Sequence, residues 1–262
     1  MPDKNTNLLS MRGVFKAFPG VQALENVDFD LRKGEIHALV GENGAGKSTL
    51  VKIITGVERP DAGTITLDGE PIQTKSPQHA QELGISTVYQ EINLCENLSI
   101  AENILLGREP RKFGRIDWRG MQEKANNILQ RLGVDIDVTK DLGEYSLAVQ
   151  QMAAIARALD ISEAKILILD EPTSSLDAHE TAQLFEVMRK LKKEGLGIIF
   201  ITHFLDQIYE VTDRITILRN GQLVGTHETS ALPRLELIAQ MIGRVIGDFH
   251  DMTQIKLKSD KA

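Results

Sequence analysis

Residues 41–49 read Gly41-Glu42-Asn43-Gly44-Ala45-Gly46-Lys47-Ser48-Thr49 and match the pattern G-x-x-x-x-G-K-[ST] in full. Glycines at these spacings let the backbone curl, so that consecutive N–H groups point at one phosphate group. The apolar run Ile36–Val40 predicts a buried strand before the loop, and a helix is expected from about Ser48 to Thr55 after it. Because the pattern and its flanks agree, a phosphate-binding loop is favoured over a flexible loop with a chance lysine.

Each residue type in this loop has a chemical task on a nucleoside triphosphate. The positive end of the following helix faces the phosphates. Lys47 places a point charge on the β- and γ-phosphates, and the Ser48 hydroxyl is a ligand for Mg²⁺. The candidate nucleotide-binding residues of the loop are Gly41, Glu42, Asn43, Gly44, Ala45, Gly46, Lys47, Ser48 and Thr49.

Two further apolar runs end in side chains suited to this chemistry. Ile166–Asp170 predicts a strand that is followed by Glu171, and ligands bind at strand ends in α/β sheets. Asp170 is placed to hold the Mg²⁺ shell, mostly through water, and Glu171 to polarise the attacking water. The strand Ile198–Thr202 is expected beside the Asp170 strand and leads to His203, which would then be within reach of a γ-phosphate. The alternative is that these groups simply end strands in solvent, which the intact upstream loop disfavours.

The rest of the chain alternates between short apolar runs and helical stretches, as in a parallel sheet wound with helices. Two segments alternate in hydropathy instead and contain hairpin turns, at Asp68-Gly69 and at Asn220-Gly221. The stretch from about Ile100 to Leu159 reads mostly as helix, interrupted by a basic, glycine-flanked loop at Gly107–Gly114. These patterns predict an α/β core, an antiparallel β subdomain near the N-terminus and an inserted α-helical subdomain.

Composition narrows the class of protein further. The 262 residues are 42% apolar, enough for a sizeable core, and carry a formal net charge of −7. This acidic balance argues against a nucleic-acid partner, whose binding relies on phosphate neutralisation. Cys95 is the only cysteine, so an intrachain disulfide or a cysteine-based metal cluster is excluded. The apolar runs are also far shorter than the roughly 20 residues that cross a bilayer.

Together these motifs resemble the ATPase subunits of ABC transporters, over about Leu8 to Arg244. The resemblance rests on the phosphate loop, Val88-Tyr89-Gln90-Glu91, Asp170-Glu171-Pro172-Thr173, Ser175-Leu176-Asp177 and Thr202-His203. It implies a P-loop NTPase (RecA-like) core whose ATP-binding domain spans 8–246, with a helical subdomain at about 95–160 and a polar tail at 247–262.

The resemblance also implies the roles of individual residues. ATP and Mg²⁺ would be the cofactors. Glu171 and His203 would be catalytic, and Ser48, Gln90 and Asp170 would surround the metal. Gln90 would also sense Mg²⁺ and meet the membrane subunit. Phe18 would stack on adenine, and the alternative for Phe18 is an ordinary core position.

The match is closer to importers of ribose, galactose and galactofuranose. It is carried by Phe18-Pro19-Gly20-Val21-Gln22-Ala23-Leu24, Tyr89-Gln90-Glu91-Ile92-Asn93-Leu94 and Ala101-Glu102-Asn103-Ile104. This implies sugar uptake through polytopic membrane permease subunits, a second ATP-binding domain or chain, and, indirectly, a periplasmic sugar-binding protein. The chain would be peripheral, on the cytoplasmic face of the inner membrane. A soluble, non-transport ABC ATPase is the alternative, but such proteins need paired domains or long coiled-coil insertions, which this sequence lacks.

One motif departs from the family, whose usual signature is Leu-Ser-Gly-Gly-Gln. The matching residues are Tyr145-Ser146-Leu147-Ala148-Val149. The signature heads a helix whose N–H groups and serine grip the γ-phosphate on the opposite subunit. Leu147 and Ala148 add Cβ atoms where the backbone must approach closely, so the chain is expected to complete its partner's site poorly. Sugar importers of this type often have such a signature in the first of two ATP-binding halves, which this chain resembles.

Four basic residues lie close together in the sequence outside these motifs. Arg108, Arg111, Lys112 and Arg115 gather within and beside the predicted loop at Gly107–Gly114. A solvated loop is favoured over a binding patch, because charge runs mostly form solvated surfaces.

Overall fold

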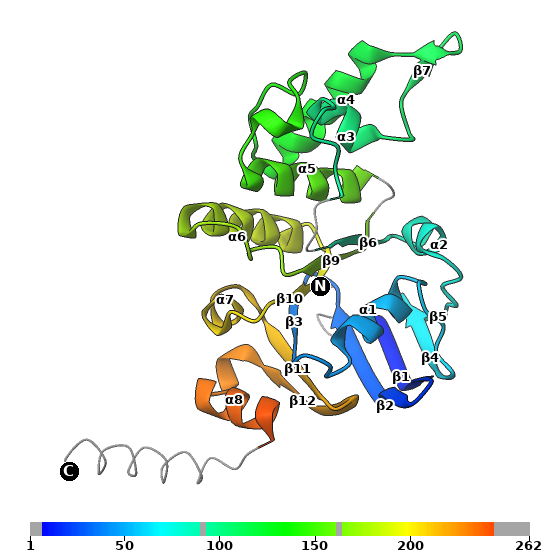
Figure 1. Cartoon of the computed structure of the whole chain (residues 1–262), viewed down its shortest axis with the longest axis vertical. Coiled ribbons are helices and arrows are strands. Elements are labelled where there is room, and N and C mark those ends of the chain that lie inside the picture. Colours follow the sequence, from blue (N-terminus) through cyan, green and yellow to red (C-terminus); the bar gives the residue numbers. More distant parts are fainter. Residues whose placement is uncertain (1–6, 90–92, 161–163, 244–262) are drawn as a thin grey trace, which may run out of the picture.

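Six strands form the central sheet, in the order β12-β11-β3-β10-β9-β6 (Figure 1). The computed structural model describes residues 7–89, 93–160 and 164–243. β12 is antiparallel to β11, and all other neighbouring strands are parallel. The strands are β3 (Ile36–Val40), β6 (Ile85–Val88), β9 (Ile166–Asp170), β10 (Gly197–Ile201), β11 (Arg214–Arg219) and β12 (Gln222–Glu228). The predicted wound parallel sheet is confirmed.

Four antiparallel strands form a second sheet, in the order β2-β1-β4-β5. They are β1 (Asn7–Phe18), β2 (Val21–Arg32), β4 (Ala62–Leu67) and β5 (Glu70–Pro71). The predicted turn Asp68-Gly69 joins β4 to β5 with φ angles of 52° and 83°, as a two-residue hairpin turn requires. The predicted antiparallel subdomain is therefore confirmed.

Helices cover the central sheet and build the inserted subdomain. The α-helices are α1 (Lys47–Ile54), α2 (Pro77–Glu82), α3 (Ile100–Leu105), α4 (Trp118–Leu132), α5 (Leu147–Asp160), α6 (Ala178–Lys193), α7 (Leu205–Val211) and α8 (Arg234–Ile242). Two short 3₁₀ helices are η1 (Leu142–Glu144) and η2 (Thr229–Ala231). None of the helices in these described ranges is long and apolar enough to cross a membrane.

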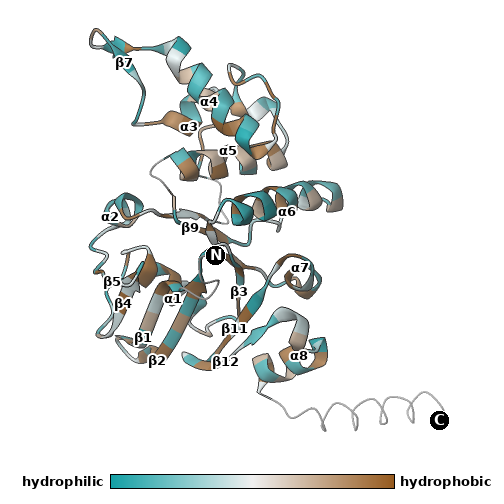
Figure 2. Ribbon diagram, turned by 180° about the vertical axis from the view of Figure 1, so that it is seen from behind, coloured by the Kyte–Doolittle hydropathy of each residue, from teal (hydrophilic) through white to brown (hydrophobic). Residues whose placement is uncertain are grey.

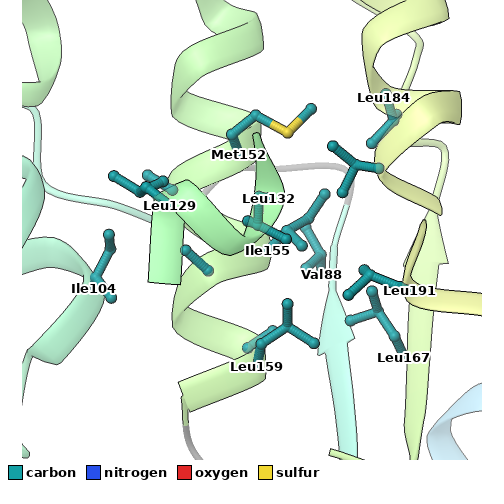
Figure 3. Packing of buried hydrophobic residues seen from close by; sticks show 14 of the residues in the cluster. Val88, Ile104, Leu129, Leu132, Met152, Ile155, Leu159, Leu167, Leu184 and Leu191 are labelled. Atoms are coloured by element: carbon teal, nitrogen blue, oxygen red, sulfur yellow. The ribbon is translucent and has the colours of Figure 1, made fainter. Parts of the chain in front are cut away.

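Strand β9 shows why the core strands have continuous apolar sequences. Successive side chains of a strand point to opposite faces of the sheet. Ile166 and Ile168 pack with α1 and the N-terminal sheet. Leu167 and Leu169 pack with α5 and α6, and Figure 3 shows Leu167 facing Leu191 in this second cluster. Both faces are buried, so β9 needs apolar residues at every position before its last.

The helical part consists of α3, α4 and α5 and stands at one end of the molecule in Figure 1. A capping box between Ser99 and Glu102 starts α3, and the Asp117 side chain accepts a hydrogen bond from Gly120 N at the start of α4. The apolar face of α5 packs against both α4 and the core, as Figure 3 shows for Met152 and Ile155. Figure 2 shows α6 with both hydrophobic and hydrophilic positions, as expected for a helix with one buried face.

The expected irregular loop at Gly107–Gly114 is the main correction. The chain instead forms a small antiparallel hairpin of β7 (Arg111–Lys112) and β8 (Arg115–Ile116). The turn residues Phe113 and Gly114 both have positive φ, 53° and 77°, which turns the chain back on itself in two residues. The basic residues and flanking glycines indicated a loop because a loop and a short hairpin have similar compositions. Only the type of turn distinguishes them.

Candidate functional site

The phosphate loop, residues 41–49, connects β3 to α1 at the end of the sheet where β9 and β10 also finish. Gly41, Gly44 and Gly46 have φ angles of 153°, 80° and 105°. These are conformations that favour glycine, which explains their spacing in the sequence. Helix α1 begins at Lys47, one residue earlier than expected, and its first turn has no side-chain cap from Gly46. The uncapped N–H groups are donors suited to an anion.

Two neighbouring segments press on this loop and hold its shape. A Cβ atom on Gly41 would lie 2.3 Å from the Leu218 carbonyl oxygen, and one on Gly46 would lie 2.8 Å from the Ala23 carbonyl oxygen. The turn between β11 and β12 adds a hydrogen bond from Gly221 N to the Ala45 carbonyl, at 3.1 Å. Sequence reasoning identified Asn220-Gly221 only as a turn and missed this supporting role.

Lys47 lies across its own loop. Its Nζ donates to the carbonyl oxygens of Gly41 and Glu42 at 2.7 and 3.0 Å. Burial lowers the pKa of this amine, while the charges of Glu171 and Asp170 act in the opposite direction. Among the described residues, this half-buried ammonium donates hydrogen bonds to neutral carbonyls only, so it gains most from an added anion, such as a phosphate group.

Asp170 and Glu171 follow each other at the end of β9. Burial, and secondly the neighbouring charge of Glu171, raise the pKa of Asp170, while Lys47 lowers it. Glu171 has a φ of 48°, which is unusual for a residue with a Cβ, and its backbone N–H donates to the Ile201 carbonyl at 2.9 Å. The fold therefore holds Glu171 in a strained conformation, as is common at functional sites.

His203 and Glu171 meet at this edge of the sheet. The His203 Nδ1 atom lies 3.2 Å from Glu171 Oε2, because β10 pairs directly with β9. Gln207 of α7 connects the two strand ends: its Oε1 accepts hydrogen bonds from the hydroxyls of Thr173 and Thr202, at 2.6 and 3.3 Å. Gln207 carries no motif, and sequence reasoning missed it.

Replacing Asp170 by Asn is expected to raise the melting temperature of the nucleotide-free chain at neutral pH. The raised pKa means that ionised Asp170 destabilises the folded chain. This cost is absent below the ordinary pKa of an aspartic acid and is complete above the raised pKa. The advantage of Asp170→Asn should therefore grow as pH rises through that window, and calorimetric melting at several pH values measures it. A pH-independent difference would contradict the assigned cause.

The other predicted site residues lie as follows. Ser48 and Thr49 are in the first turn of α1, and Glu42 and Asn43 are exposed in the loop, whereas Ala45 is buried. Phe18 ends β1 with 37% of its surface exposed and Lys16 Nζ 5.2 Å from its ring centre, so it is not an ordinary core residue. Gln90 lies outside the described residues.

The residues present suit Mg²⁺. Asp170 and Ser48 offer the oxygen ligands that this ion prefers. Besides burial, the charge of Glu171 raises the pKa of Asp170, which marks a site of concentrated negative charge that a divalent cation would relieve. No trio of His, Cys, Asp and Glu able to hold a metal occurs in the described ranges, so the phosphates and water would supply the remaining ligands.

Comparison with known proteins identifies this arrangement. The sequence pattern of the ABC transporter family matches residues 24–174, more than half of the chain. The chain belongs to the ABC transporter family. A solved ATP-binding cassette of an ABC transporter in its ADP conformation is 26% identical, with a TM-score of 0.77, and the match covers 90% of this chain and 94% of that one.

Other proteins are more similar to the chain in sequence. The galactofuranose transporter ATP-binding protein of Escherichia coli K12 is 52% identical over 261 residues, 99% of this chain and 52% of the relative. The fructose import ATP-binding protein of Bifidobacterium longum is 54% identical over 93% of this chain and 47% of its own length. The chain thus spans about half the length of these relatives.

Proposed function

We propose that this chain binds and hydrolyses ATP to drive the uptake of a sugar, most simply a monosaccharide, through separate membrane subunits. Two kinds of observation support the proposal. The phosphate loop, the two carboxylates and His203 converge at one end of the sheet, with His203 Nδ1 3.2 Å from Glu171. The relatives at 47–54% identity over most of the chain are named for the import of galactofuranose, fructose and ribose.

In this proposal each residue has one task. The loop N–H groups and Lys47 bind the phosphates, and Phe18 stacks on adenine. Ser48, Gln90 and Asp170 would hold Mg²⁺, which neutralises the charge that develops on the phosphates. Glu171 accepts a proton from the attacking water, and His203 donates a hydrogen bond toward the γ-phosphate. The Gln207 contacts keep the ends of β9 and β10 in register for these tasks.

The proposed membrane partner docks in a groove between the core and the helical part. This groove, of about 430 Å³, is lined by α2, the end of β6, α5 and the segment Leu106–Arg108 that follows α3. Its lining mixes apolar and polar side chains, among them Leu94, Leu106 and Arg157. Polytopic permease subunits at this groove would hold the chain on the cytoplasmic face of the membrane, and a periplasmic sugar-binding protein would act only through them. We take 8–246 as the ATP-binding domain and 247–262 as a polar tail, and residues 244–262 lie outside the described residues.

Exchanging this chain for the matching half of the Escherichia coli galactofuranose transporter ATP-binding protein tests the function. Identity of 52% over 261 residues makes the exchange practical. We expect the chimaera to support galactofuranose uptake. The same chimaera with Lys47→Ala should lose uptake at least about tenfold, because a charge-assisted phosphate contact is lost. A chimaera that assembles and hydrolyses ATP but never supports uptake would favour a soluble, non-transport ATPase.

A further inference from the structure

The β7–β8 hairpin projects from the helical part at the end of the molecule farthest from the second sheet (Figure 1). All six of its residues, from Arg111 to Ile116, are exposed. Its strands pair only with each other, over the two residue pairs Arg111–Ile116 and Lys112–Arg115. A two-stranded hairpin of this size is at best marginally stable in water. Residues at its tip that further destabilise it therefore suggest a role other than folding.

The turn at the tip contains an unusual residue. Three two-residue turns in the described part of the chain have positive φ at both positions: Asp68-Gly69, Asn220-Gly221 and Phe113-Gly114. Two of them use Asp or Asn, the residues that tolerate this conformation, but the hairpin tip uses phenylalanine at φ 53°. The Phe113 ring buries nothing in return, since 96% of its surface is exposed.

The positive charges at the tip, like Phe113, do not stabilise the hairpin. Arg111, Lys112 and Arg115 form no ion pair within the described chain, although Arg108 binds Asp160 and Arg119 binds Glu123 nearby. Lys112 and Arg115 lie directly opposite each other, and like charges in this position destabilise a hairpin. The chain as a whole carries a net charge of −7, so this positive tip stands out from its surroundings.

Apolar side chains accompany these cations. Ile116 is 37% exposed and Trp118, at the start of α4, is 52% exposed. The hairpin and the start of α4 therefore present three large apolar side chains on a convex projection. The hairpin adds three cations, of which Arg111 is close enough to Glu109 to interact with its charge. Side chains of these two kinds are typical of surfaces that enter the headgroup region of a membrane, where apolar rings insert and cations meet anionic headgroups.

We propose that the β7–β8 hairpin binds the anionic surface of the membrane, with Phe113 inserted among the lipids. The inference rests on the proposed function, because Gly107 and Arg108, just before the hairpin, line the groove proposed for the permease. The hairpin thus rises from the rim of that groove. A convex tip of unpaired cations and exposed rings suits a deformable lipid surface better than a folded protein, which would need a matching cavity. The sequence favoured a solvated loop over a binding patch for these basic residues, and the proposal instead makes them a binding patch.

Flotation of the full chain with lipid vesicles tests the proposal. The chain should float with vesicles of phosphatidylcholine and phosphatidylglycerol, but not with phosphatidylcholine alone, and added salt should weaken the binding. Phe113→Asn should weaken it about tenfold, the effect of no longer burying one phenylalanine ring. Replacing Arg111, Lys112 and Arg115 together by Gln should weaken it about a hundredfold or more.

Phe113→Asn also controls for folding. It gives the hairpin tip an Asn-Gly turn, the same pair of residues that forms the turn at Asn220-Gly221, so the variant should keep the hairpin and melt at the same or a higher temperature. Leu235→Asn, at a leucine with 64% exposure, and the triple Gln variant of Lys33, Lys190 and Lys193 are matched controls and should bind vesicles normally.

Three results would overturn the hairpin proposal. They are no binding of the parent chain to protein-free anionic vesicles, binding by both hairpin variants that equals that of the parent chain, and binding only to vesicles that contain permease. The last result would indicate a protein partner instead. Calorimetric MgATP binding by the same samples reports separately on the proposed function, which can hold when the lipid proposal fails.

Discussion

Replacing Glu171 by Gln is expected to slow ATP hydrolysis by about a hundredfold or more, the scale of losing a general base. The substitution keeps the size of the side chain but removes the basic carboxylate. MgATP binding should persist, because the phosphate loop and Lys47 are unchanged. Steady-state hydrolysis in the assembled transporter, together with calorimetric binding, separates the two effects.

The geometry of Glu171 makes this prediction specific. Burial, and secondly the charge of Glu171, raise the pKa of the neighbouring Asp170. Glu171 is turned out of the strand by its φ of 48° and reaches His203. Glu70→Gln, an exposed control on β5, should leave hydrolysis unchanged. If Glu171→Gln hydrolyses ATP at the parent rate, Glu171 is not the base.

The sequence predicted the parts of this site that depend on local pattern. The phosphate loop could be recognised because the turn needs glycine at fixed positions, and Gly41, Gly44 and Gly46 do adopt positive φ. Strands β9 and β10 could be recognised because both faces are buried, which requires unbroken apolar runs. That His203 lies beside Glu171 followed from the expected pairing of these two strands.

The sequence could not predict contacts between distant segments that use ordinary residue types. Gln207 binds Thr173 and Thr202 across 34 and 5 positions of the chain, and no spacing rule links a glutamine to two threonines. Gly221 supports Ala45 from a turn that lies far along the chain. The hairpin at Phe113 was predicted as a loop from its basic residues and flanking glycines. Its turn contains no hairpin signal that the sequence could offer, because phenylalanine is disfavoured there.

The altered signature, Tyr145–Val149, lies at the start of helix α5. Helix α5 begins at Leu147, the first position where the family has glycine, and 47% of the Leu147 surface is exposed there. Ala148 is nearly buried within the same turn. The start of α5 lines a pocket of about 240 Å³ together with Glu171, Ser174 and Ser175. In a pair of ATP-binding units, the Leu147 side chain would stand between the helix N–H groups and a partner's γ-phosphate.

The purified chain alone is therefore expected to hydrolyse ATP slowly, and restoring the signature should accelerate it. Loss of one backbone or side-chain donor to a transition state typically costs about 10²–10³ in rate. The triple variant Leu147→Gly, Ala148→Gly and Val149→Gln should raise the steady-state rate of the self-paired chain by about a hundredfold, and the rate should become steeply dependent on protein concentration. Leu235→Gly, which makes the same change in the first turn of α8, should have no effect on the rate. If the parent chain already hydrolyses ATP at a high rate that depends steeply on protein concentration, two copies of the chain form working sites. The hypothesis that it needs a partner with an intact signature would then be wrong.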